Sequence, residues 1–213
     1  THNVSSAASD VYKRQLFVSK HQRGPITLFQ RTPRGEVAIQ LNSGNYYYSQ
    51  CIYQFSHELA HVRADFQPID HENKWLEETL CETASLFVLR KLSKEWEQSA
   101  PNDALKNYRK HLASYSATVM KSREILTTKT SQNFYQKHKE TLRKSATERE
   151  LNGAFANLLL PLFEKEPTHW KILPKFPRIK GSTLAEHFAA WRKATSENHH
   201  DFLNRLETLF LKK

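Results

Sequence analysis

The sequence predicts a mainly α-helical chain with a small N-terminal β-hairpin or sheet, which is an α+β fold. Three observations support this prediction. Glycine is rare, at five of 213 residues, and Lys, Glu, Leu and Ala recur in long runs that favour helix over sheet. Segments with strand character lie near the N-terminus, before residue 42. Helical patterns fill most of the chain from residue 46 onward.

Composition narrows the classes of protein that the chain can belong to. Hydrophobic residues make up 38% and charged residues 25%, which is typical of a globular and rather polar protein. No apolar run is long enough to predict a membrane span. The net charge is +10, but the basic residues are spread along the second half without a nucleic-acid-binding motif. We therefore expect a solvated basic face and no specific nucleic-acid site.

The first residues differ in kind from the rest. The segment 5–15, SSAASDVYKRQ, resembles an in-frame translation of a sequencing adapter. Residues 1–15 are therefore expected to be a non-native, adapter-like tail without function, and they are left out of fold reasoning. The natural part of the chain is expected to begin near Leu16, already truncated.

The segment after the tail predicts a hairpin. Residues 26–29 are β-branched or aromatic and follow Gly24-Pro25, so they are expected to form a strand. Residues 32–35 form a turn motif, and residues 37–41 read as the second strand. The polar segment 42–45 then ends the strand and caps a helix.

The helix expected over residues 46–66 is amphipathic. Its apolar residues follow each other at intervals of three and four, which predicts one apolar face packed into the core. On a helical wheel, His57, Glu58 and His61 lie more than about 90° from the centre of that face. We therefore expect the helix to turn these three residues away from the core. The apolar residues are Ile52, Phe55, Leu59, Val62 and Phe66.

The same three residues form the pattern His-Glu-x-x-His. Histidines four residues apart lie on one face of a helix, one turn from each other, and can bind the same zinc ion. Glu58, next to His57, can then reach a water molecule bound to the metal. A catalytic zinc site needs a third protein ligand and one position open to water.

The next predicted helix, from residue 73 or 75 to 96, offers the missing ligand. Glu78 and Glu82 are four residues apart and share a face, whereas Glu77 is turned about 100° from Glu78. One of the pair Glu78 and Glu82 is therefore the expected ligand. The helix belongs to a predicted N-terminal lobe with the metal site, residues 16–100, and a helical C-terminal lobe is predicted over 101–213. Further helices are expected at about 103–127, 131–146, 147–165, 182–196 and 199–212, with an irregular segment over 167–181.

Two segments together carry a family resemblance. HELAH followed by WLEETLCE resembles the gluzincin metallopeptidases, the thermolysin-like zinc peptidases and their aminopeptidase relatives. The resemblance implies a zinc peptidase that cuts peptide or protein substrates, with Glu58 as general base. It implies His57, His61 and Glu78 as zinc ligands and Glu82 as the carboxylate that hydrogen-bonds a ligand histidine. It also implies that the strand 37–41 is an edge strand that pairs with extended substrate.

The resemblance covers residues 36–92 and leaves alternatives open. Sixteen residues separate His61 from Glu78, slightly fewer than these families usually show, and Glu82 as ligand would give twenty. The segment 82–87 resembles a helix of the ImmA/IrrE-type proteases, which would favour Glu82 and a regulatory protease acting on one partner. A catalytically inactive, peptidase-like binding module is the other alternative.

The cysteines are the last informative residues. Cys51 and Cys81 both fall in predicted helices beside the motif residues, where small buried thiols are expected. Two cysteines do not make a disulfide framework, so a reducing compartment such as the cytoplasm is mildly favoured. The sequence does not rank the tyrosines and histidines of the C-terminal half as groups that stabilise the oxyanion.

Overall fold

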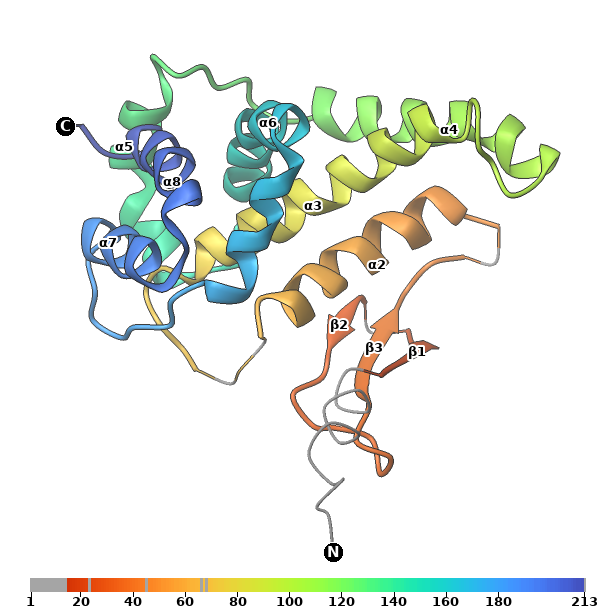
Figure 1. Cartoon of the computed structure of the whole chain (residues 1–213), viewed down its shortest axis with the longest axis horizontal. Coiled ribbons are helices and arrows are strands. Elements are labelled where there is room, and N and C mark those ends of the chain that lie inside the picture. Colours follow the sequence, from red (N-terminus) through yellow and green to blue (C-terminus); the bar gives the residue numbers. More distant parts are fainter. Residues whose placement is uncertain (1–14, 23, 45, 66, 68, 213) are drawn as a thin grey trace, which may run out of the picture.

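The computed structural model describes residues 15–22, 24–44, 46–65, 67 and 69–212. The adapter-like tail expected over residues 1–15 lies outside these residues except for Gln15. The backbone carbonyl of Gln15 accepts a hydrogen bond of 2.8 Å from the N–H of Val37. The predicted fold class is confirmed, because the described chain is mostly helical with one three-stranded sheet near the N-terminus (Figure 1).

The sheet has the strand order β1-β3-β2. β2 (Ile26–Thr27) pairs antiparallel with β3 (Val37–Leu41), which confirms the predicted hairpin, and β1 (Leu16–Lys20) pairs parallel with β3. The prediction that β3 is an edge strand is wrong, because it has a neighbour on both sides and its hydrogen-bonding edges are occupied. The strand not predicted from the sequence, β1, is what makes β3 central.

The helices follow the predicted order, with ends that differ by a few residues. The largest difference is at the end of α4, which stops at Lys121 instead of residue 127. The segment expected to be irregular holds a 3₁₀ helix, η1 (Pro167–Lys175). The remaining elements are α2 (Tyr48–Arg63), α3 (Lys74–Glu95), α4 (Asp103–Lys121), α5 (Ser131–Lys144), α6 (Arg149–Lys165), α7 (Leu184–Ala194), η2 (Glu197–His199) and α8 (His200–Thr208).

The other elements pack around α3. This helix lies against α2, α4 and α6, and its Trp75, Leu80 and Leu86 are almost inaccessible to solvent (Figure 1). The ring of Trp75 contacts aromatic rings of α5 and α6 and that of Phe210, just beyond α8. A helix with buried side chains on several faces is typical of a domain centre. The resulting core joins residues from both sides of residue 100, and the predicted boundary between two lobes stays a prediction.

α2 lies between the small sheet and α3 (Figure 1). The expectation that its apolar face is the buried one is wrong. Ile52, Phe55, Leu59 and Val62 are only half-buried, and Phe66 lies outside the described residues. Val62 lines a hollow of about 110 Å³ together with Val37 of β3 and residues of the loop between β2 and β3.

The buried line of α2 is polar instead. Gln54, Glu58 and His61 are all buried, and each has a partner on a neighbouring element. Gln54 exchanges two hydrogen bonds with the backbone of Asn42, at 2.8 and 2.9 Å. Buried polar groups are stable only where they are paired in this way. The motif residues therefore face the neighbouring elements that surround α2.

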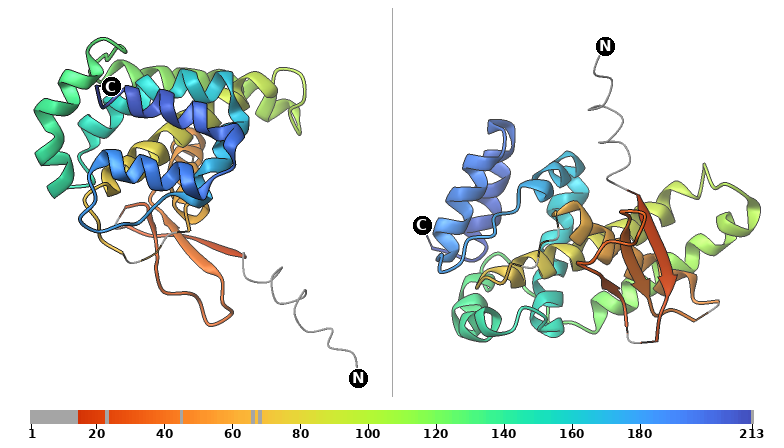
Figure 2. Two further views of the ribbon diagram at one scale, coloured as in Figure 1. Left: turned by 60° about the vertical axis from the view of Figure 1, so that its left-hand side comes forward. Right: turned by 90° about the horizontal axis from the view of Figure 1, so that it is seen from below.

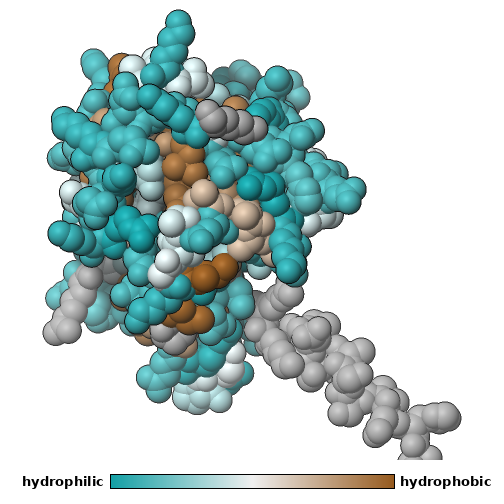
Figure 3. Space-filling view, turned by 90° about the vertical axis from the view of Figure 1, so that its left-hand side faces the viewer, coloured by the Kyte–Doolittle hydropathy of each residue, from teal (hydrophilic) through white to brown (hydrophobic). Residues whose placement is uncertain are grey.

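The C-terminal helices close the other end of the molecule. α7 and α8 lie side by side outside α6, as the two views of Figure 2 show. The surface at this end is largely hydrophilic, with apolar side chains gathered in a narrow band (Figure 3). Among the residues that the structure describes, no helix combines the length and apolar character needed to cross a membrane.

Two histidines are buried together between α7 and the loop that precedes α3. His71 and His187 stack with ring centroids 6.0 Å apart, and His187 is fully buried. Their ring nitrogens have no hydrogen-bond partner among the described residues. Burial, together with the positive charges of His71 and Arg178, lowers the pKa of His187 to about 3. Burial also lowers the pKa of His71.

We expect this pair to make the fold sensitive to acid. A histidine in the unfolded chain has a pKa of about 6.5. Below that pH, His187 therefore binds a proton in the unfolded chain but not in the folded one. The free energy of unfolding should fall as the pH drops from about 6.5 towards 3, by at most about 1.4 kcal/mol per pH unit for each such histidine. Urea unfolding at pH 7 and pH 4.5 should show a smaller loss for His187→Phe than for the wild type. An equal loss in both proteins would contradict the assignment.

Candidate metal centre

The two histidines of the motif lie on the side of α2 that faces α3. Their ring centroids are 5.1 Å apart, as expected for positions four residues apart on a helix. The side chain of His57 is 20% exposed and that of His61 only 6%. One imidazole therefore reaches solvent, while the other is enclosed.

Glu78 of α3 meets both histidines through a single oxygen. Its Oε2 lies 3.3 Å from His57 Nε2 and 3.4 Å from His61 Nε2. A tetrahedral zinc site with bonds of about 2.0–2.1 Å has neighbouring ligand atoms about 3.3–3.4 Å apart. Each of the two distances from Glu78 Oε2 therefore matches the spacing between two ligands of one zinc ion.

The opposite nitrogen of each histidine faces another carboxylate of α3. Glu82 Oε2 lies 3.4 Å from His57 Nδ1, and Glu77 Oε1 lies 2.9 Å from His61 Nδ1. The position of Glu82 agrees with a carboxylate that orients a ligand histidine, and its predicted role stays a prediction. The sequence reasoning set Glu77 aside because it is turned about 100° from Glu78. In the structure, this different direction places the Glu77 carboxylate beside Nδ1 of His61.

Two arginines from later in the chain hold these two carboxylates. Arg178, between η1 and α7, donates a hydrogen bond of 3.0 Å from Nη2 to Glu77 Oε2. Arg123, just after α4, donates to Glu82 Oε1 and to the hydroxyl of Tyr53. Sequence reasoning found neither arginine, because both lie in irregular segments of a basic chain and no local pattern distinguishes them.

Glu58 points towards the sheet. Its Oε2 accepts a hydrogen bond of 2.8 Å from the hydroxyl of Thr27 on β2, and its backbone carbonyl lies 3.2 Å from the same hydroxyl. Both residues are buried. Glu58 is therefore tied to the edge strand of the sheet, on another side of α2 from Glu77, Glu78 and Glu82.

Cys81 brings a further donor to the same place. It lies one turn beyond Glu78 on α3 and is completely buried. The ligand atoms of His57, His61 and Cys81 all lie within 4.8 Å of one another. Burial raises the pKa of the Cys81 thiol to about 12. Both cysteines are free thiols, and Cys51 is only half-buried.

The electrostatics of the cluster also favour a cation. Burial raises the pKa of Glu78, but hydrogen bonds from His57 and His61 outweigh it and hold that pKa well below the usual value. Burial alone would lower the pKa of His61. Contacts with Cys81, Glu77 and Glu78 outweigh burial and raise that pKa well above its usual value. A proton or a metal cation between these groups is therefore strongly stabilised.

The chain matches no protein-family model, no curated protein and no solved structure. The gluzincin resemblance therefore rests on the residues of the two sequence segments alone. The three proposed ligands and the neighbouring acids come together from two helices. The general-base candidate, Glu58, is held by Thr27 of β2 on another side of α2.

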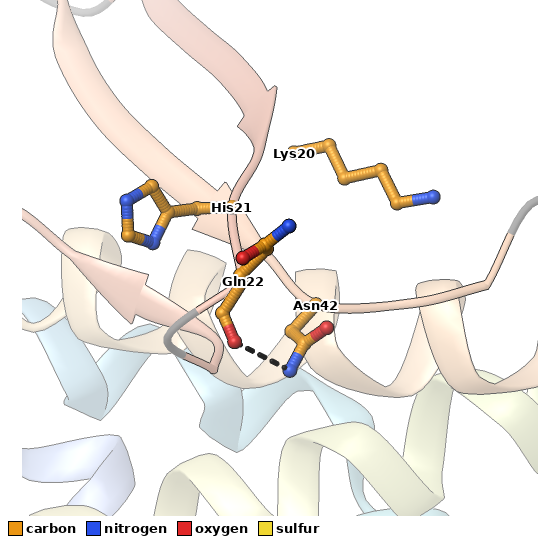
Figure 4. A pocket seen from close by; sticks show the side chains of 4 residues that line it. All are labelled: Lys20, His21, Gln22 and Asn42. Atoms are coloured by element: carbon orange, nitrogen blue, oxygen red, sulfur yellow. Dashed lines mark hydrogen bonds between the residues drawn. The ribbon is translucent and has the colours of Figure 1, made fainter.

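Another hollow lies elsewhere on the sheet layer. It has a volume of about 500 Å³ and is lined by Lys20, His21, Gln22 and Asn42 (Figure 4). The side chain of Asn42 donates a hydrogen bond of 3.2 Å to the backbone carbonyl of Gln22. None of these residues is among the metal-ligand candidates.

Proposed function

We propose that the chain is a zinc-dependent metallopeptidase that hydrolyses peptide bonds. The observation that carries the proposal is the meeting of Glu78 Oε2 with the Nε2 atoms of His57 and His61, at 3.3 and 3.4 Å. These would be the three zinc ligands. Imidazole and carboxylate donors at this spacing are typical of catalytic zinc sites, which keep the fourth position for water.

The charges of the cluster support a cation. The carboxylates that contact the histidines are those of Glu77, Glu78 and Glu82, and the guanidinium groups of Arg178 and Arg123 contact the first and the last of these. Buried charges are stable only when they are compensated. A cation would balance the negative charge that Glu78 carries between the two histidines.

Zinc bound there would polarise the scissile carbonyl and lower the pKa of its water to about 7. Glu58 would take a proton from the attacking water as the oxygen adds to the carbonyl carbon. Glu58 would then deliver that proton to the nitrogen as the carbon–nitrogen bond breaks. The Thr27 hydroxyl occupies one direction around Oε2 and so fixes the orientation of the carboxylate.

A second candidate function is a zinc-stabilised binding module without catalysis. The proximity of Cys81 favours it, because a fourth protein ligand would occupy the position that water needs. A protease that acts on one regulatory partner, as in the ImmA/IrrE resemblance, would use the same two histidines, with Glu82 in place of Glu78 as the third ligand.

Metal removal tests the proposal directly. Purified protein should contain one zinc ion per chain and cleave members of a mixed peptide library, as measured by elemental analysis and mass spectrometry. Chelation should abolish both properties, and added zinc should restore both. A protein that lacks stoichiometric zinc even after reconstitution would refute both candidate functions. Zinc without cleavage of any peptide or protein substrate would favour the binding module.

A further inference from the structure

The metal ligands of the proposed site are connected to the C-terminal part of the chain by two matched sets of contacts. In the first set, Arg178 Nη2 contacts Glu77 Oε2 at 3.0 Å, and Glu77 Oε1 contacts His61 Nδ1 at 2.9 Å. The two oxygens of one carboxylate are thus divided between an arginine and a histidine. The side chains of Glu77 and Arg178 are only 3% and 11% exposed, so solvent contributes little to holding them.

The second set repeats this arrangement at the other histidine. Arg123 contacts Glu82 Oε1, and Glu82 Oε2 lies 3.4 Å from His57 Nδ1. Tyr53 supports it, since its hydroxyl donates to Glu82 Oε1 and accepts from Arg123. The arginine side chain passes over Gly153 of α6, where an added Cβ would lie 2.7 Å from Arg123 Nε.

A carboxylate at Nδ1 determines how an imidazole presents Nε2. It accepts the Nδ1 hydrogen, which leaves the Nε2 lone pair free for the metal and fixes the plane of the ring. The carboxylate can do this only if it is itself held in place. In both sets an arginine occupies the other oxygen, and arginine is suited to this task because its donors are rigidly arranged.

We propose that Arg178 and Arg123 are positioning residues of the metal centre, each fixing the carboxylate that orients one zinc-binding histidine. The inference rests on the proposed function, since it concerns the same metal. It gives the C-terminal part of the chain a role at the site. Neither arginine needs to touch the metal or the substrate.

The test compares metal affinity in three variants. Arg178→Gln should weaken zinc binding by up to about 10- to 100-fold, the effect of removing the carboxylate that contacts a metal ligand directly. Arg192→Gln is the matched control, because Arg192 forms a similar partly buried pair with Glu207, at 2.7 Å between α7 and α8. Arg178→Lys keeps the charge but not the fork of donors, so its affinity should fall between those of the wild type and Arg178→Gln. Competition with a chromophoric chelator measures each affinity.

The cobalt(II) spectrum separates positioning from a general loss of stability. A change in the visible bands of cobalt-loaded Arg178→Gln, absent from the control, would indicate altered ligand geometry. Equal affinity and an unchanged spectrum in folded Arg178→Gln would overturn the inference while leaving the proposed function intact. Wild-type protein without metal binding would instead refute the proposed function. If Arg178→Gln does not fold, Arg178→Lys is judged by the same two measurements.

Gly153→Ala tests the second set without removing any charge. The added methyl group would force Arg123 away from its present path, and Glu82 would lose the contact that holds it. Zinc affinity should fall and the cobalt spectrum should change, as for Arg178→Gln. Unchanged affinity in this variant, with Arg123→Gln also unaffected, would exclude a role for Arg123.

Discussion

Glu58→Gln should retain one zinc ion per chain and lose about 10²- to 10⁴-fold in peptide hydrolysis, the range expected for removal of a general base. The amide has nearly the shape of the carboxylate, and its oxygen can still accept the hydrogen bond from Thr27. It cannot take a proton from water. Elemental analysis measures the zinc, and mass spectrometry of a digested peptide library measures the rate.

The chain provides a matched control for this substitution. Glu36 accepts a hydrogen bond of 2.8 Å from the hydroxyl of Thr32, the same chemistry at the same distance in the hairpin turn. Glu36→Gln should leave both zinc content and hydrolysis unchanged. Full activity in Glu58→Gln would exclude Glu58 as the base, whereas a loss of zinc from that variant would mean that its role is structural.

Glu78→Ala should abolish stoichiometric zinc binding, whereas Cys81→Ser should leave it in place. Glu78 contributes the oxygen that faces both Nε2 atoms, so its removal leaves two ligands. Cys81 lies close to both histidines, and we expect it to pack beside the metal without binding it, because Glu78 would supply the third ligand and water the fourth. Glu82→Ala should weaken zinc binding by only about 10- to 100-fold, because Glu82 is expected to act through His57.

Cobalt substitution makes this comparison decisive. A thiolate bound to cobalt(II) gives a strong near-ultraviolet charge-transfer band, which histidine and carboxylate ligands do not give. The wild type should lack this band. Its presence in the wild type and loss in Cys81→Ser would make Cys81 a ligand and would favour the non-catalytic binding module. Loss of zinc in Glu82→Ala with retention in Glu78→Ala would exchange the roles of the two glutamates.

Local patterns in the sequence predicted most of the fold. The helix that carries the motif, the central helix and the hairpin are each set by spacing and turn residues within about twenty positions. β1 was missed because its three apolar residues lack a pattern of their own. It forms only by pairing with β3, and the position of that partner is not readable from residues 16–20.

The burial of α2 shows where periodicity fails. Its apolar residues predicted the buried face, but the elements on both sides of the helix bury a polar line instead. Gln54, Glu58 and His61 remain buried because Asn42, Thr27 and Glu77 complete their hydrogen bonds. These partners lie on β2, on α3 and just after the end of β3, so no property of the helix alone could indicate them.

The sequence predicted the proposed metal ligands of the candidate site, but not the residues that hold the neighbouring carboxylates. Two helices with fixed spacing bring His57, His61 and Glu78 together, and the sequence contains that spacing. The residues that hold their partners come from far along the chain. Arg123 lies 41 residues from Glu82, and Arg178 lies 101 residues from Glu77. Contacts over such distances depend on the whole fold.

The separation of Arg178 from Glu77 has a consequence for biosynthesis. A ribosome releases the motif helix and α3 long before residue 178 emerges, so the nascent chain holds all three proposed ligands but lacks one of the groups that aim them. Folding domains generally form as units during synthesis. High-affinity metal capture would then wait until the segment that carries Arg178 has been made, and the proposed activity would begin only after that point.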